Sequence, residues 1–593
     1  MHLPSLADTG DRAIRAALRF PLVVVSGAAA TLGAWFTIAD GNDPWIRLTL
    51  AALLGLPLFL SLQLWIERRH YGRRGALLIG ALGLLVPLAF HLMSRDWSQT
   101  LLVTRFLHLE IALHLTVAIA PFLGQSGDNA FWQYNRILFL RFLTGALFTL
   151  VLFAGLALAL AALDKLFGVD VDSDLYFHLF WLLAFFFSPW YFVAGVPRDL
   201  VELESRQDYP VGIKVFAQFI LIPLVTVYLL ILTTYLGRVL ITRTWPSGWI
   251  GWLVSGVSVA GTLALLLVHP LRDREDSRWV NAYGRYFFVA LLPSVAMLLM
   301  AIWQRVGQYG FTERRYFLLV LALVLAGLAL WYAITASRNI RVIPASLAAA
   351  AFLTLLGPWS AYAIARDSQQ GRIEEALARN GMLADGRATA ATAGISLEDQ
   401  RQISAATHYL LATHGERSVE PLLTSGRSPA GPLRSYEADE RARAILEPLG
   451  IDYSARWAHT EEEYFFLHVQ PARAERLSGY DWMFETDIAV PGQVAIGTDT
   501  LTFRRLAGLL AFSIARDTDV LMQMDMSDSI AAVIANQGLW MSPRGIQLDD
   551  LSYTSENERI ALRVRIQQLH GRRTEGPDSV LSAPARLFLK MKD

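Results

Sequence analysis

One apolar segment carries most of the chemically interesting side chains in the N-terminal half of the chain. The run "LLVTRFLHLEIALHL", which begins at Leu101, contains Arg105, His108, Glu110 and His114. At about 100° per residue, the glutamate shares one helix face with His114, whereas the arginine shares another face with His108. Ionisable groups in a membrane helix are costly, so they indicate a proton relay or a substrate site. The alternative is a structural ion pair, with the arginine reaching outwards and the glutamate bonded to a neighbouring helix.

A second group of candidates consists of arginines beside aromatic residues, around "WPSGW" from Trp245 and "YGFTERRY" from Tyr309. They are Arg238, Arg243, Arg305, Arg314 and Arg315. A guanidinium binds phosphate or carboxylate through two parallel hydrogen bonds, so these residues are candidates for binding an anion or a lipid headgroup. Alternatively, they anchor helix ends and pair with Glu313 or with the domain that follows the helices.

Several kinds of chemistry lack their usual residues. The chain has no cysteine, which excludes disulfides, thiolate metal sites and iron–sulfur clusters. None of its lysines follows a glycine, so a Walker-type phosphate loop is excluded, and the HExxH, GxSxG and GxGxxG patterns are missing. The aspartates of "DVDSD" from Asp170 lack the glycine and glutamate of a calcium-binding EF-hand loop. We therefore predict no catalytic residue, no metal site and no cofactor.

The candidates lie among long apolar runs. Apolar residues make up 54% of the 593 residues, and they are concentrated before residue 365. A helix needs about 20 apolar residues to cross a bilayer, because its backbone groups must be satisfied internally. The sequence predicts about eleven spans, at 20–38, 45–66, 75–93, 101–123, 140–163, 175–196, 215–237, 248–269, 287–306, 316–335 and 343–364. The predicted class is thus a mainly α, polytopic membrane bundle over 20–364, with the lipid bilayer as its surroundings.

Basic residues in alternate loops predict the direction of the bundle. The side that includes the N-terminal segment 1–19 carries 18 Lys and Arg residues, and the opposite side carries 8. Such an excess is typical of the cytoplasmic side. The N-terminus is therefore expected in the cytoplasm and, with an odd number of spans, the C-terminal domain outside it. A net charge of zero gives no reason to expect nucleic acid as a partner.

The C-terminal part, residues 366–593, reads as a soluble α+β domain. Helices are predicted near 367–380, from Ser396 to Gly415 and over 436–447, with a capping box at Ser396 and Asp399. His408 and His414 are six positions apart, on different helix faces, and indicate no site. Strands are predicted in "EYFFLHV", "YDWMFETDI", "VLMQMDM", "RIALRVRIQQL" and "ARLFLKM", of which the fourth alternates clearly. Helices followed by strands favour an antiparallel sheet.

Several long segments carry a family resemblance. They are "FWQYNRILFLRFLTGALFTLVLFAGLALALAALDKLFGV" from Phe131, "AGVPRD" from Ala194, "VFAQFILIPLVTVYLLIL" from Val215, "TWPSGW" from Thr244, "QYGFTERRY" from Gln308 and "DSQQGRIEEALARNGMLADGR" from Asp367. In these segments the chain resembles the integral membrane family known as domain of unknown function 4153. The resemblance implies residence in the bacterial inner membrane with a fused soluble tail, which would then be periplasmic. It implies no activity.

Three functions compete on this evidence. The first is a non-enzymatic membrane protein that positions its periplasmic domain for sensing, assembly or envelope maintenance, with an envelope protein as partner through residues 366–593. The second is a proton- or ion-coupled transporter that uses Glu110 and His114. The third is an enzyme that acts on a lipid-linked substrate at the arginine-rich mouth, with Glu313 as its base. The missing catalytic motifs favour the first.

Overall fold

The computed structural model covers the whole chain, and the description below is confined to part of it. The described residues are 6–40, 43–124, 127–206, 208–243, 250–272, 278–335, 339–384, 386–392, 394–419, 435–453, 463–468, 479–496, 499–506, 508–516, 519–536, 551–573 and 579–592. These residues form two compact units. The first unit comprises residues 1–392 and 406–449, and the second comprises residues 393–405 and 450–593. The predicted "WPSGW" segment lies outside the described residues.

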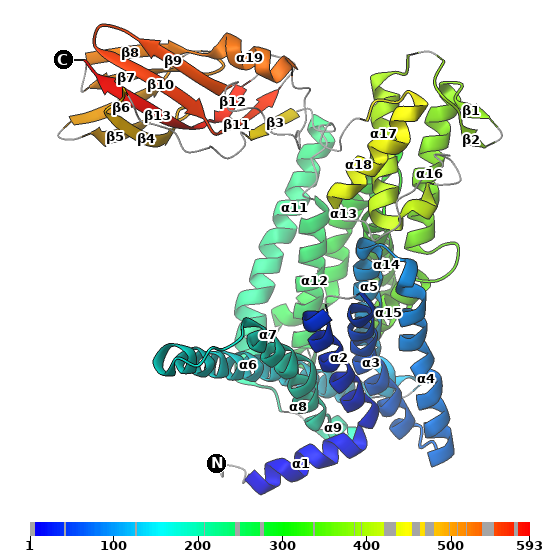
Figure 1. The fold of residues 1–593 in the computed structure, drawn as a ribbon. Coiled ribbons are helices and arrows are strands. Elements are labelled where there is room, and N and C mark those ends of the chain that lie inside the picture. The colour runs from blue at the N-terminus through cyan, green and yellow to red at the C-terminus, as the bar shows by residue number, and fades with distance from the viewer. Residues whose placement is uncertain are drawn as a thin grey trace. The chain divides into compact units, whose positions relative to one another are not determined.

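The first unit is helical (Figure 1). Its N-terminal half contains α1 (Leu6–Arg19), α2 (Pro21–Asp40), α3 (Asp43–Arg68), α4 (Arg73–Met93), α5 (Gln99–Ile119), α6 (Asp128–Phe167), α7 (Ser173–Trp181), α8 (Ser188–Ala194) and α9 (Leu200–Ser205). It continues with α10 (Val211–Val215), α11 (Ile222–Thr242), α12 (Ile250–Val268), α13 (Arg278–Tyr309), α14 (Glu313–Thr335), α15 (Val342–Leu353) and α16 (Ala361–Arg379). Six-residue π-helical turns join α7 to α8 and α10 to α11, so each of these pairs forms one continuous segment.

Ten helical segments within the described residues are long and apolar enough to cross a membrane. They correspond to the first ten predicted spans and confirm the mainly α membrane-bundle class. The eleventh predicted span, 343–364, is not one helix. It consists of the 12-residue α15 and the start of α16, and residues 354–360 between them are not helical. A search for apolar runs passes over this break, although the non-helical stretch contains Gly357 and Pro358, a pair that interrupts helices.

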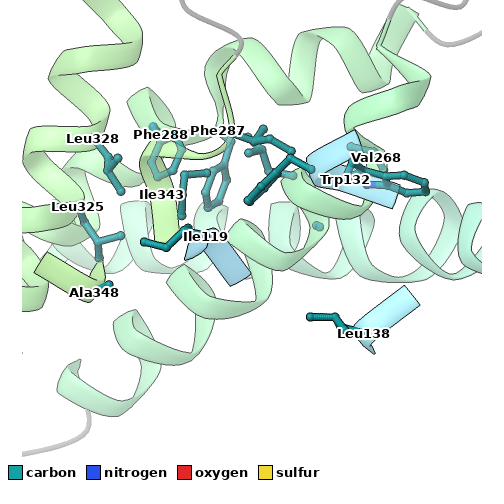
Figure 2. Packing of buried hydrophobic residues seen from close by; sticks show 14 of the residues in the cluster. Ile119, Trp132, Leu138, Val268, Phe287, Phe288, Leu325, Leu328, Ile343 and Ala348 are labelled. Atoms are coloured by element: carbon teal, nitrogen blue, oxygen red, sulfur yellow. The ribbon is translucent and has the colours of Figure 1, made fainter. Parts of the chain in front are cut away.

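Large apolar side chains fill the interior of the bundle. Phe287, Phe288 and Leu291 of α13 are at most 3% exposed and belong to one continuous buried cluster. Figure 2 labels Phe287 and Phe288 of α13 together with Leu325 and Leu328 of α14 and Ile343 of α15 in this cluster. Because the interior is tightly packed, shortening one of these side chains would remove dispersion contacts with its neighbours. The cluster therefore fixes the helices that carry the ionisable residues.

Further helices follow the bundle within the first unit. A short hairpin of β1 (Leu383–Ala384) and β2 (Arg387–Ala388) separates α16 from α17 (Leu397–His414) and α18 (Ser435–Leu446). The predicted capping box is confirmed, because the Asp399 backbone N–H donates to Ser396 Oγ at 3.1 Å and the Ser396 hydroxyl donates to the Asp399 carboxylate at 2.9 Å. We call α16, residues 406–414 of α17 and α18 the helical cap.

The second unit contains antiparallel sheets, as predicted. Its strands are β3 (Glu463–His468), β4 (Trp482–Asp487), β5 (Gly492–Ile496), β6 (Asp499–Arg505), β7 (Ala511–Arg516), β8 (Asp519–Asp525), β9 (Ser552–Glu556), β10 (Ile560–Ile566), β11 (Gln568–Arg573), β12 (Ser579–Ser582) and β13 (Pro584–Met591). They form sheets in the orders β4-β13-β10-β9, β12-β11-β3 and β5-β6-β7-β8. Helix α19 (Ser527–Asn536) follows β8.

The predicted strands are present, and the structure adds others. β10 shows the predicted alternation, since its residues are in turn buried and half-buried. The predicted strand from Arg559 to Leu569 is divided at Gln567 between β10 and β11. β5, β6, β7, β9, β12 and α19 were not predicted. Strands such as "DTLTFRR" are short and polar on one face, so their pattern is too weak to recognise without the neighbouring strands.

Candidate functional site

The four ionisable residues of α5 lie on two faces of the helix, as their spacing predicts. His114 Nδ1 lies 3.0 Å from Glu110 Oε2, and these two residues form a local pair. The His114 side chain is 67% exposed at the surface of the bundle. Arg105 and His108, in contrast, contact residues from elements far along the chain. The structure therefore separates the predicted cluster into one local pair and one interior group.

His108 is buried between two polar side chains. Its Nδ1 lies 3.3 Å from the Tyr362 hydroxyl, and its Nε2 lies 3.2 Å from Thr354 Oγ1. Phe317 of α14 contacts the ring edge-on, with 4.8 Å between centroids. Buried polar groups are nearly always hydrogen-bonded, and His108 meets this requirement with partners on both nitrogens. It thus connects α5 to both sides of the break between α15 and α16.

The break itself is held by specific contacts. Gly357 adopts a φ of +78°, a left-handed conformation that favours glycine. The Ala361 N–H donates to the Thr354 carbonyl at 2.9 Å, and the indole N–H of Trp359 donates to the Leu353 carbonyl at 3.0 Å. Non-helical backbone inside a membrane protein must find such partners, because lipid offers none. The break is therefore an ordered part of the structure.

A second polar group joins α14 to the helical cap. Glu313 is the first residue of α14 and is 7% exposed. Its Oε2 accepts a hydrogen bond from the Tyr409 hydroxyl, and its Oε1 lies 2.9 Å from His414 Nε2. The histidine contact is within ion-pair distance, but its geometry is off the hydrogen-bond axis. A carboxylate at a helix N-terminus interacts favourably with the positive end of the helix dipole.

The environment of Tyr409 keeps its hydroxyl protonated. Burial raises the pKa of Tyr409 well above its ordinary value, and the negative charge of Glu313 raises it further. The hydroxyl therefore remains a hydrogen-bond donor to the carboxylate at neutral pH. Glu313, Tyr409 and His414 form what we call the cap junction.

Other polar contacts fix the cap to the same end of the bundle. The Ser98 hydroxyl at the start of α5 donates to the Thr413 carbonyl. Arg417 Nη1 lies 3.1 Å from Asp96 Oδ2. The Gln369 amide donates to the Phe311 carbonyl at 2.8 Å. The cap thus contacts the bundle through several elements, and both the cap junction and the contact between Ser98 and Thr413 are buried.

The five arginines predicted at the outer mouth, here called the rim arginines, have different surroundings in the structure. The Arg314 guanidinium lies over the Trp252 ring, 4.7 Å from its centroid. Arg315 donates instead to the carbonyls of Tyr309 and Gly310, at 3.1 Å and 2.6 Å. Arg238 lies in the last two turns of α11, Arg243 follows that helix with a φ of +55°, and Arg305 lies in α13. An anion site made of all five stays a prediction.

Comparison with known protein families identifies the family of this chain but assigns no activity to it. The family model described as "Domain of unknown function (DUF4153)" matches residues 26–389, which is more than half of the chain. The chain belongs to this family. A relative from Pasteurella multocida (strain Pm70), "Uncharacterized protein PM1469", is 24% identical over 375 residues. The match covers 60% of this chain and 60% of that relative, and no solved structure matches.

The matched part of this DUF4153 protein contains only one side of the cap junction. Arg105, Tyr362 and Glu313 lie within residues 26–389, whereas Tyr409 and His414 lie beyond them. The sequence indicates Glu313 as a candidate base and gives no role to His414. Within the described residues, no group of three His, Asp or Glu side chains is arranged to hold a metal ion. The sequence shows only that a glutamate stands at the start of a predicted helix. This position does not indicate which distant residues the glutamate contacts.

Proposed function

We propose that this protein is a bacterial inner-membrane protein that holds a non-catalytic domain on the periplasmic side, for sensing, assembly or envelope maintenance. The observation that supports this proposal is the cap junction. A simple tether needs one apolar helix of about 20 residues. Here the helices that follow the bundle are bound to it through a carboxylate that is 7% exposed. The bundle therefore fixes the position of its cap as well as anchoring it.

The energetics favour a permanent junction. Burying a carboxylate costs several kcal/mol unless nearby groups compensate for the lost water. Tyr409 and His414 provide this compensation, and both come from the cap. Separation of the cap would expose or leave unpaired all three groups. The cap is accordingly expected to remain docked through the working cycle of the protein.

The same geometry argues against the third hypothesis, an enzyme that uses Glu313 as its general base. A general base must reach the proton that it removes, at about 2.6–3.2 Å or through one water. One oxygen of Glu313 accepts a hydrogen bond from Tyr409, the other lies 2.9 Å from His414 Nε2, and the side chain is 9% exposed, so a substrate has little access to it. The transporter that uses Glu110 and His114 gains no support from a cavity, because these residues pair with each other at the bundle surface.

Periplasmic placement of the second unit is tested by cysteine labelling. Because the natural chain lacks cysteine, each single substitution gives one reactive site without background. Arg12→Cys and Glu558→Cys are suitable, since both side chains are exposed. In intact spheroplasts, a membrane-impermeant maleimide is expected to label Glu558→Cys and to label Arg12→Cys only after permeabilisation. The reverse pattern would place the second unit in the cytoplasm.

The same variants test the role as a binding protein. A cysteine-reactive, impermeant cross-linker attached at Glu558→Cys is expected to give a discrete adduct with a periplasmic or membrane protein in intact cells. The unsubstituted protein is the background control, and Arg12→Cys is the control for reagent entry. If Glu558→Cys and other exposed cysteines in residues 479–592 give no specific adduct, the proposal of a partner-binding domain is contradicted.

A further inference from the structure

Arg105 contacts two aromatic rings but has no anionic partner among the described residues. Its guanidinium carbon lies 4.4 Å from the centroid of the Trp97 ring and 4.4 Å from that of the Tyr362 ring. Trp97 precedes α5, and Tyr362 is the second residue of α16 after the break. A cation between two aromatic faces is held in place, but the rings contact only its two flat faces. The N–H groups around its edge remain to be satisfied.

No described residue satisfies those N–H groups. Arg105 Nε is buried without a hydrogen-bond partner, and no described carboxylate forms an ion pair with Arg105. Glu313 is one of the charges that act on Arg105, but both of its oxygens are engaged in the cap junction. A half-buried guanidinium without a partner is unfavourable, because charges removed from water require compensation.

Arg19 shows how the same chain completes a comparable site. Its guanidinium lies over the Phe20 ring, 4.6 Å from the centroid. Its Nε donates to Glu67 Oε1 at 3.0 Å, and its Nη2 donates to Glu67 Oε2 at 2.7 Å. This is the side-on bidentate geometry in which a planar guanidinium holds a carboxylate. Arg105 has no such carboxylate partner among the described residues, and its Nε is enclosed by the chain.

We propose that Arg105, held between Trp97 and Tyr362, binds the phosphate or carboxylate group of an anionic ligand. The aromatic rings hold the guanidinium in place, and the ligand's two oxygens bind its terminal nitrogens, because Nε is enclosed by the chain itself. A lipid headgroup and a dissolved anion share this chemistry. The site lies at the end of the bundle where α5 begins and beside the break before α16, and it is separate from the five rim arginines. It does not depend on the proposed role of the second unit.

Ligand-induced stabilisation of the purified full-length chain in a non-ionic detergent tests this site. A ligand that binds the folded state raises its unfolding temperature in a saturable, concentration-dependent way. One arm titrates phosphatidylglycerol in mixed micelles, and the other titrates inorganic phosphate at constant ionic strength. Saturation by phosphatidylglycerol alone identifies a headgroup site, whereas equal saturation by phosphate identifies a site for a dissolved anion.

Two substitutions distinguish this site from the rim. Arg105→Gln is expected to weaken binding of the effective probe by at least about tenfold, the change expected when a charge-assisted bidentate contact is lost. Arg314→Gln removes an exposed rim arginine that also lies over a tryptophan, and it is expected to leave binding within about twofold. The two variants change the net charge equally, so a general electrostatic effect would weaken both.

Further outcomes decide the proposal. Arg105→Lys keeps the positive charge but loses the planar fork, so it is expected to bind more weakly than the natural protein even if Arg105→Gln does not fold. The proposal is overturned if neither probe stabilises the natural protein, if both Arg105 variants bind normally, or if Arg314→Gln alone loses binding. The last result would assign the anion to the rim.

Discussion

Two glutamate–histidine pairs in the helical unit have nearly the same separation and very different surroundings. Glu110 and His114 are 3.0 Å apart on one helix, and the histidine side chain is 67% exposed. Glu313 and His414 are 2.9 Å apart, and their side chains are 9% and 6% exposed. The first pair is four positions apart, whereas the second joins α14 to the end of α17. We call them the local pair and the junction pair.

The comparison shows that the contribution of an ion pair to the free energy of unfolding depends on its burial as well as on the distance between its atoms. A pair at the surface keeps access to its surroundings, so losing one partner costs little. Removing one member of a buried pair leaves the other charged group without compensation, and this costs roughly 3–5 kcal/mol. The two pairs should therefore respond very differently to the same substitution.

The largest effect is expected for His414→Ala. This change leaves the Glu313 carboxylate with Tyr409 as its remaining cap partner, and the folded state should lose about 3–5 kcal/mol relative to the unfolded state. Denaturant unfolding in detergent, followed by circular dichroism, measures the loss. Limited trypsin digestion should also cut sooner near Arg417, because that residue follows His414 of the junction by three positions.

Glu313→Gln provides the matched test of this explanation. Combined with His414→Ala, it removes the uncompensated charge, so the double variant should be more stable than the sum of the two single losses predicts. Strict additivity would show that the two residues act independently. In that case, the junction would owe its stability to packing rather than to the pair.

The two pairs also show what the sequence could predict. The local pair was predictable, because helical periodicity alone places residues four apart on one face. The junction pair was not, because it requires the start of α14 to meet the end of α17, nearly 100 residues later. The same limit applies to Tyr362 and Thr354, which contact His108 from both sides of a helix break. The membrane class and ten spans followed from composition, whereas the break in the eleventh is marked locally by Gly357 and Pro358 and not by a loss of apolar residues over the whole span.

An intermediate effect is expected for Tyr409→Phe. The ring remains, but the hydrogen bond to the Glu313 carboxylate is lost, and bonds to charged groups contribute about 1.5–3 kcal/mol. Unfolding in detergent measures this loss as well. A loss equal to that of His414→Ala would contradict the ranking, because the phenylalanine variant keeps the histidine contact.

Tyr409 also gives the junction a dependence on alkaline pH. Its pKa is raised in the folded state by burial and by Glu313, relative to an unfolded value near 10. The associated stability is therefore fully present below about pH 10 and is lost as the pH rises further. Trypsin sensitivity near Arg417 should increase over this alkaline range in the natural protein. The increase should be smaller in Tyr409→Phe, which has no hydroxyl to ionise at the junction.

The smallest effect is expected for His114→Ala. Only one member of this pair, Glu110 at 16% exposed, is enclosed by the chain, and His114 is 67% exposed, so the loss should stay well below that at the junction pair. A loss of several kcal/mol would mean that the local pair is buried by something that the chain alone does not supply, such as a second copy or a bound lipid. Glu110→Gln then separates structure from transport. If Glu110→Gln stops solute flux in proteoliposomes without lowering stability, the local pair carries protons or ions. A pair that contributes little to stability would then be essential for transport.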